Sequence, residues 1–209
     1  MRKISLMLLS IILPLAIASC FALSSTSFFN ESADASSKVD LENLTIWYIG
    51  NTNGMLGKAL NRMQQLGVKH IKYLEMEKFF SNNTSKSMSL NQDLLVIFDS
   101  YWISERVNNP EIHRFVREAS YQKAKLAAIG ELTSKFFEVL DKAGVNELGR
   151  DENGNIRNPA YYNPPLVGFK LKQVSAPDGH SYLYPSIFIS SCEDIDLMVQ
   201  ALINWSGGW

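Results

Sequence analysis

Polar and reactive side chains stand directly after several apolar segments of this sequence, where predicted β-strands end. Amide, carboxylate, hydroxyl and thiol groups at such positions could hold a polar ligand or act as acids, bases and nucleophiles. The carboxyl ends of the strands in an open α/β sheet line a common ligand crevice. The sequence therefore predicts a pocket whose candidate ligand-binding residues are Asn51, Asn53, Asp99, Ser100, Tyr101, Glu131 and Cys192.

These candidates do not complete a catalytic motif. His70, His113 and His180 are dispersed along the chain and lack the spacing of metal ligands, so we expect no metal site. Cys192 precedes a predicted helix, a position that can activate a thiol, although burial or a disulfide with Cys20 is the simpler interpretation. We therefore expect a non-enzymatic binding module. The alternative is a hydrolase or transferase that uses the same strand-end residues.

The turn after the first predicted strand is rich in glycine. Gly50, Gly54 and Gly57 form G-x-x-x-G-x-x-G, which resembles the cofactor-binding glycine loop of short-chain dehydrogenase relatives. The glycines fit that family's usual forms only after a one-residue shift, and the bulky Tyr101 and Trp102 replace the small residues of its cofactor site. An exported protein also has little access to nicotinamide cofactors. We therefore predict a strand-to-helix turn that binds no cofactor.

Residues 93–143 carry a second resemblance. The segments DLLVIFDSYW and NNPEIHRFVREASYQKAKLAAIGE resemble the core of class I glutamine amidotransferase-like proteins, a strand, a loop, a helix and a second strand. In that family a sharp turn after the second strand carries a cysteine nucleophile, and Gly130 occupies that position here. No His-x-Glu pair follows in the sequence. The resemblance therefore implies a flavodoxin-like layer and argues against that family's chemistry.

Apolar, β-branched segments alternate with amphipathic helical segments over much of the chain. The unit repeats about every 30 residues, which predicts a doubly wound, mostly parallel α/β sheet of the flavodoxin-like or Rossmann-like three-layer kind. A C-terminal hairpin and a final helix complete the predicted fold. The strands are expected over residues 44–50, 70–74, 93–99, 125–130, 166–175 and 181–190.

Capping residues predict where the helices begin. Asn53 is expected to cap the first helix, and Asn109 to cap a helix that has Pro110 at its first position. Ser190 and Glu193 form a possible capping box for the final helix.

The N-terminus predicts export. A short positive segment precedes an apolar run and a small-residue cleavage signal, which is the pattern of a secretory signal peptide over residues 1–18. Residues 19–42 are rich in Ser and Ala and predict a flexible linker. Residues 43–209 then form a single α/β domain. We therefore expect a protein outside the cytoplasm, either secreted or anchored to the outer face of the cell membrane.

Cys20 leaves three alternatives for the mature N-terminus. Residues 17–20, IASC, resemble a bacterial lipobox, in which the cysteine receives lipid and becomes the first mature residue. Cleavage after Ala18 would instead leave Cys20 able to pair with Cys192, and cleavage after Ala22 would remove it. A single acyl chain binds membranes only marginally, so a stable lipid anchor would need more than one.

Composition limits the partners of the protein. A chain of 209 residues with 46% hydrophobic residues can bury one sizeable core. Its net charge of -1 gives no support for a broad basic surface, so we expect no nucleic-acid partner. The expected partner is an extracytoplasmic ligand or protein, with a membrane contact through a lipid anchor as a further possibility. Glycosylation acceptor patterns occur at Asn30, Asn43, Asn82, Asn83 and Asn204.

Overall fold

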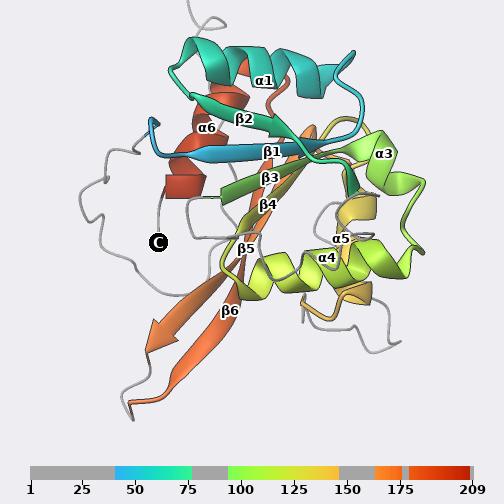
Figure 1. Cartoon of the computed structure of the whole chain (residues 1–209), viewed down its shortest axis with the longest axis vertical. Helices are drawn as coiled ribbons and strands as arrows, with labels where there is room; N and C mark the ends of the chain where they lie inside the picture. Colours follow the sequence, from blue (N-terminus) through green and yellow to red (C-terminus); the bar gives the residue numbers. More distant parts are fainter. Residues whose placement is uncertain (1–40, 77–93, 146–162, 176–178, 208–209) are drawn as a thin grey trace, which may run out of the picture.

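The computed structural model describes residues 41–76, 94–145, 163–175 and 179–207 (Figure 1). Six strands form one sheet in the order β2-β1-β3-β4-β5-β6. The strands are β1 (Thr45–Ile49), β2 (His70–Tyr73), β3 (Leu94–Asp99), β4 (Lys125–Ile129), β5 (Leu166–Ser175) and β6 (Ser181–Ser190). The helices are α1 (Met55–Gln65), α3 (Ser100–Ser104), α4 (Pro110–Tyr121), α5 (Ser134–Lys142) and α6 (Ile195–Gly207).

The sheet is parallel across four strands and antiparallel at one edge. β1 pairs in parallel with β2 on one side and with β3 on the other, and β3 pairs in parallel with β4. β5 runs antiparallel to β4, and β6 runs antiparallel to β5. The prediction of a doubly wound, mostly parallel sheet with a C-terminal hairpin and a final helix is confirmed. The direction of winding reverses between β1 and β3.

β3 is buried on both faces because its side chains alternate between two separate cores. Leu94, Val96 and Phe98 belong to one core cluster, whereas Leu95 and Ile97 belong to the other. A parallel strand that is covered on both sides carries a continuous apolar sequence in place of alternating polar residues. β4 is also buried along its whole length, and it is apolar after its first residue, Lys125.

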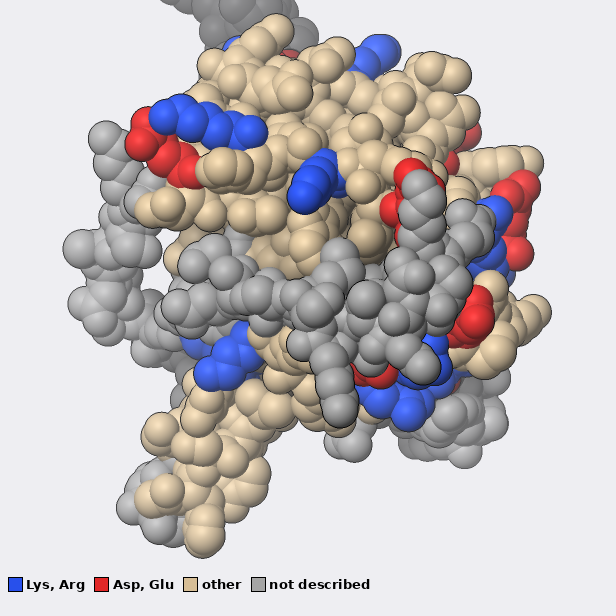
Figure 2. Space-filling view, viewed as in Figure 1, with Lys and Arg blue, Asp and Glu red and all other residues tan. Residues whose placement is uncertain are grey.

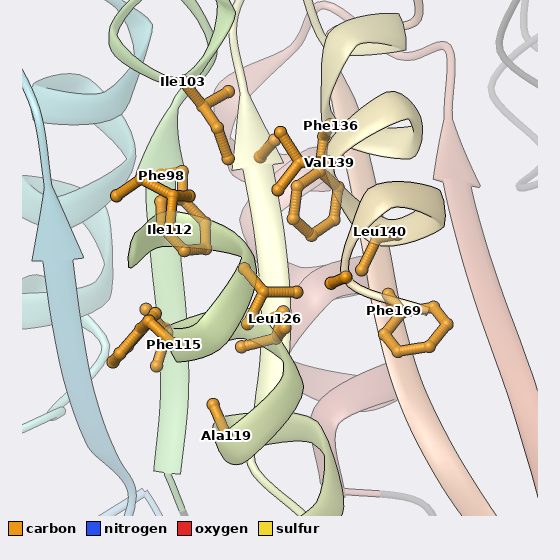
Figure 3. Close-up of a cluster of buried hydrophobic side chains, with 14 of the residues drawn as sticks. Phe98, Ile103, Ile112, Phe115, Ala119, Leu126, Phe136, Val139, Leu140 and Phe169 are labelled. Carbon is orange, nitrogen blue, oxygen red and sulfur yellow. The ribbon is translucent and has the colours of Figure 1, made fainter. Parts of the chain in front are cut away.

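Helices cover both faces of the sheet and make a three-layer structure. α1 and α6 pack on one face, and α3, α4 and α5 pack on the other (Figure 1). On the second face the Phe98 ring centroid lies 6.3 Å from that of Phe115 and 5.8 Å from that of Phe136 (Figure 3). Burying one such ring contributes about 1.5–3 kcal/mol. The cluster therefore anchors β3, whose carboxyl end leads into the candidate site.

The first helix lacks the predicted side-chain cap. Gly54 is its N-cap residue, and no side chain caps it. The Asn53 N–H instead donates to Asn51 Oδ1 over 2.9 Å and closes a turn before the helix. This turn folds against α1, because a Cβ on Gly57 would lie only 1.8 Å from the carbonyl oxygen of Thr52. The chain therefore enters the helix through Gly54, and the prediction that Asn53 caps it is wrong.

The predicted capping box of the final helix is also wrong, because Asp194 caps that helix. Asp194 Oδ1 accepts hydrogen bonds from two backbone N–H groups in the first turn of α6, over 2.9 and 3.0 Å. The Ser190 hydroxyl oxygen instead accepts from the Cys192 N–H over 3.3 Å. Ser190 thus still belongs to the end of β6, so the helix begins later than expected. Glu193 is left exposed between the strand and the helix.

A neighbouring residue caps α4, whereas a residue that is distant in the sequence caps α5. Asn109 Oδ1 accepts from the Glu111 N–H over 2.9 Å, and Pro110 is the first helical residue, so this prediction is confirmed. At α5 the Ser134 N–H donates to Asn163 Oδ1 over 2.9 Å. This hydrogen bond links Asn163, which precedes β5, to the start of α5, which follows β4.

The β5–β6 hairpin extends beyond the helices (Figure 1). Its strands match the predicted ranges at both ends, with Leu166 opposite Ser190 and Ser175 opposite Ser181. The inner half of the hairpin is buried, and the outer half is exposed. On the visible face the described surface of this outer half is largely uncharged (Figure 2). Pro185 lies in β6, an edge strand, where the missing N–H of a proline is best tolerated.

Several sequence predictions lie outside the described residues. They are the signal peptide over 1–18, most of the linker over 19–42, the lipidation candidate Cys20 and the acceptor sites Asn30, Asn82 and Asn83. Among the helices of the described ranges, none is long and apolar enough to cross a membrane.

Candidate functional site

A cavity opens at the carboxyl ends of the parallel strands, beside the point where the winding reverses. Doubly wound sheets bind their ligands at this point. The cavity has a volume of about 570 Å³, which falls within the range of small-molecule sites. Four parts of the chain line it: the start of α1, the β3–α3 junction, the β4–α5 loop and the segment around the start of α6.

Ser100 is the most deeply buried residue of the cavity. It is 2% exposed, and its Oγ accepts a hydrogen bond from the Leu132 N–H over 3.1 Å. The half-buried Asp99 precedes it and caps α3, since its Oδ2 accepts from the Trp102 N–H over 3.1 Å. These bonds position both side chains through the backbone of α3 and of the β4–α5 loop.

Two glycines make room for the end of β3. Gly50 has a φ of 112° and Gly130 a φ of 130°, conformations that favour glycine. A Cβ on Gly50 would lie 2.4 Å from the Cβ of Asp99, and a Cβ on Gly130 would lie 2.3 Å from Ser100 Oγ. The first glycine of the glycine-rich turn is therefore required by the convergence of β1 with β3.

Exposed side chains around the mouth carry an excess of negative charge. Glu131, Glu193 and Lys58 line the cavity and are exposed. Within the described part of the chain, no hydrogen bond or ion pair engages these three side chains. With Asp99, the described lining residues supply three carboxyl groups and one amine. Tyr101, which is 63% exposed, adds an aromatic ring to the same lining.

The remaining wall of the cavity is apolar. Met55 at the start of α1, Leu132 after β4 and Ile195 at the start of α6 are all half-buried and line it. Small-molecule sites commonly combine such apolar walls with a few placed polar groups. The cavity therefore has the composition of a binding site as well as the volume of one.

The structure brings most of the predicted pocket residues together. Those that line the cavity are Asn53, Asp99, Ser100, Tyr101 and Glu131. Asn51 does not line it, and its amide oxygen is used to close the turn before α1. Cys192 is buried and does not line it either. A ligand-binding role for the five lining residues stays a prediction.

The lining residues that sequence reasoning missed include Lys58, Glu193 and Ile195. Helical periodicity could have found Lys58, which lies one turn after the start of α1. The strand-end rule that selected Cys192 could have found Glu193, the next residue. No local signal could have found Ile195, because it reaches the cavity only through the packing of α6 beside α1. There Arg62 Nε lies 2.9 Å from Asp196 Oδ1, an ion pair without hydrogen-bond alignment.

The described residues contain no metal-binding cluster, and no histidine among them lines the cavity. In those ranges, no group of three or more His, Cys, Asp and Glu side chains is placed to hold a metal ion. His113 Nε2 lies 2.7 Å from the carbonyl oxygen of Val107, outside the cavity lining. The acid–base groups that line the cavity are its carboxylates, Lys58 and Tyr101.

Two glycosylation acceptor residues fall within the described ranges. Asn43 is exposed just before β1, and Asn204 is exposed on α6. Both side chains are therefore accessible for modification, and their occupancy stays a prediction.

The chain was also compared with known proteins. Comparison with protein-family models, with curated proteins and with solved structures gave no match. The chemistry of the cavity is therefore interpreted from its own residues.

Proposed function

We propose that this protein is an exported α/β domain that binds a small ligand in the crevice at the ends of β1, β3 and β4. The observation that carries the proposal is the cavity of about 570 Å³ at the reversal of winding. Fold geometry favours ligands at this place. Architecture alone does not determine function, so the proposal depends on the residues that line the cavity.

Those residues favour binding because the deepest polar groups are already positioned. Asp99 and Ser100 are held by hydrogen bonds from backbone N–H groups. Protein groups that are ordered before binding lose less conformational entropy when a ligand binds. The rim residues Lys58, Glu131 and Glu193 carry charges that no described neighbour neutralises, which leaves them available to a ligand.

A pair of tryptophan variants on α6 tests the proposal. Ile195 lines the cavity, whereas Leu197, two residues further along, is exposed and does not. The full chain is screened by thermal denaturation against a panel of small metabolites. A ligand at 100 times its Kd should stabilise the fold by about 2.7 kcal/mol. Ile195→Trp should remove that shift by filling the cavity, and Leu197→Trp should retain it. A ligand whose shift survives Ile195→Trp unchanged would place binding elsewhere.

A hydrolase or transferase is the second candidate, and one observation favours it. Asp99, Ser100 and Glu131 line the same cavity, so a hydroxyl and two carboxyl groups share one site. In such an enzyme Ser100 would be the nucleophile and a carboxylate its base. The test is turnover of an ester and metabolite panel by the full chain and by Ser100→Ala and Glu131→Gln. Activity that disappears with either substitution would show that the protein is an enzyme and not a binding module.

The export part of the proposal is supported by the N-terminal sequence pattern alone. Mass spectrometry of the mature N-terminus distinguishes its alternatives: lipidated Cys20, Ser19 after cleavage at Ala18, or Leu23 after cleavage at Ala22. An intact N-terminus on protein recovered from the cytosol would contradict export.

A further inference from the structure

We propose that the ligand of the crevice is a small organic ammonium compound, a protonated amine on a hydrocarbon body. This inference rests on the proposed function, since it names the ligand class of the same cavity. It follows from three features of the lining: the placement of the carboxylates, an acceptor atom on Asp99 that makes no hydrogen bond to the described residues, and the apolar and aromatic surface beside them.

The carboxylates approach the cavity from different sides. Glu131 precedes α5, which covers one face of the sheet, and Glu193 precedes α6, which covers the other. Asp99 lies at the end of β3, between these two faces. A cation in the cavity would thus meet negative charge on both sides, and among the described lining residues Lys58 is the one opposing amine. Charge complementarity of this kind selects the sign of a ligand.

Capping does not explain why Glu131 and Glu193 lie before helices. Acidic residues near a helix N-terminus are often stabilising for the helix itself. Here, however, Asp194 caps α6 and Asn163 caps α5. Among the described residues, neither glutamate side chain takes part in a hydrogen bond or an ion pair. Both carboxylates are therefore free to meet a ligand.

Asp99 supplies a partly desolvated acceptor. Its Oδ2 accepts from the Trp102 N–H, and no hydrogen bond engages Oδ1 within the described part of the chain. A half-buried carboxylate oxygen is stabilised by a donor, above all by a charged one. An ammonium group has three N–H donors and no acceptor, so it is a suitable partner for Asp99 Oδ1.

The hydrocarbon body of the ligand is inferred from the rest of the lining. Met55, Leu132 and Ile195 provide a half-buried apolar wall. The exposed ring of Tyr101 can lie over the cation or along the carbon chain. A bare metal ion would use none of this surface. An alkylammonium ion uses the carboxylates and the apolar wall together.

Three probes with the same six-carbon body test the sign of the charge. Hexylammonium chloride, 1-hexanol and sodium hexanoate are titrated into the full chain, and binding is followed at the methyl resonance of Met55 by NMR. Hexylammonium should bind most tightly, about tenfold more tightly than hexanoate, because several charge pairs act together. Its affinity should fall when the salt concentration is raised from low to physiological values.

Charge variants locate the effect. Each of Glu131→Gln and Glu193→Gln should weaken hexylammonium about two- to fivefold and leave 1-hexanol unchanged. Lys58→Gln should strengthen hexylammonium by a similar factor. Glu111→Gln is the matched control, because Glu111 is an exposed glutamate at the start of α4 that does not line the cavity. It should change nothing.

Each contrary result has its own meaning. Hexanoate binding as tightly as hexylammonium would overturn the ammonium assignment and leave the small-ligand site standing. If magnesium or calcium chloride displaces hexylammonium, and the metal no longer binds in Asp99→Asn, the ligand is a metal ion and not an amine. If no probe moves the Met55 resonance, the ammonium assignment fails. The ligand site itself is then judged separately by the metabolite screen and the Ile195→Trp variant.

Discussion

The crevice and the outer hairpin, which we define as residues 173–175 and 181–184, both lie beyond the buried core, but they are built differently. Parallel strands end together at one edge of the sheet, so loops from four parts of the chain converge on the crevice. The outer hairpin is an antiparallel pair that continues past the helices and satisfies its own ladder of backbone groups. The crevice therefore gathers side chains from distant residues, whereas the outer hairpin presents only its own.

The two regions also expose different chemistry. The crevice mouth carries charged side chains, whereas the outer hairpin carries exposed apolar ones: Val174, Tyr182, Leu183 and Tyr184. Val174 lies opposite Tyr182 in the ladder, so these two share one face of the hairpin. Such cross-strand pairs contribute little compared with core burial. We therefore expect substitutions in the outer hairpin to be tolerated far better than substitutions beside the crevice or in the core.

The largest expected effect contrasts the two halves of the hairpin. Phe169 is fully buried in β5, and Tyr182 is 46% exposed in β6. Phe169→Ala should lower the free energy of unfolding by about 3–5 kcal/mol, because it leaves a cavity in the core. Tyr182→Ala should lower it by less than about 1 kcal/mol. Urea denaturation of both variants measures the difference. Equal losses would mean that the outer hairpin is supported by contacts that the ladder does not provide.

A smaller effect is expected at the crevice, between two glycines of one turn. Gly50→Ala must adopt a positive φ and place its Cβ 2.4 Å from that of Asp99, whereas nothing lies within 4 Å of a Cβ on Gly54. Gly50→Ala should therefore cost about 3 kcal/mol of unfolding free energy. Gly54→Ala should cost no more than about 1 kcal/mol, because it meets no steric contact and loses only the N-cap preference for glycine over alanine. Thermal or urea denaturation distinguishes them, and a stable Gly50→Ala variant would refute the close approach of β1 and β3.

The smallest effect concerns the cap beside the crevice. Asp194→Ala removes the acceptor for two N–H groups of α6 and should cost about 1 kcal/mol of unfolding free energy. Glu193→Ala changes an adjacent exposed side chain that makes no capping bond, and it should be close to neutral. Urea denaturation of the two variants is the measurement. A larger loss for Glu193→Ala than for Asp194→Ala would support the capping box that the sequence pattern favoured.

The strands were predictable because each depends on a local pattern. The continuous apolar sequence of β3 reflects burial on both faces, and the turn residues between β5 and β6 marked where β5 ends and β6 begins. Helix starts were less predictable, since a side chain such as Asn53 can serve a turn or a cap equally well. The cap of α5 lies about thirty residues away at Asn163, beyond the reach of any local pattern.

The same contrast applies to the candidate site. Five of its lining residues follow strand ends, so the order of strands and loops predicted them. Lys58 was within reach of helical periodicity. Glu193 was within reach of the strand-end rule, since it follows Cys192. Ile195 was not, because the sequence does not specify that α6 packs beside α1 and brings its start to the cavity.

By itself, the sequence determined the alternation of strands and helices, the ends of the hairpin, and the polar groups that follow the strands. It also carries the pattern that predicts export. Only the tertiary structure decided which of those polar groups share a cavity and how much charge surrounds them. The physical reason is that secondary structure depends on neighbouring residues, whereas the crevice depends on loops that the sheet brings together from distant parts of the chain.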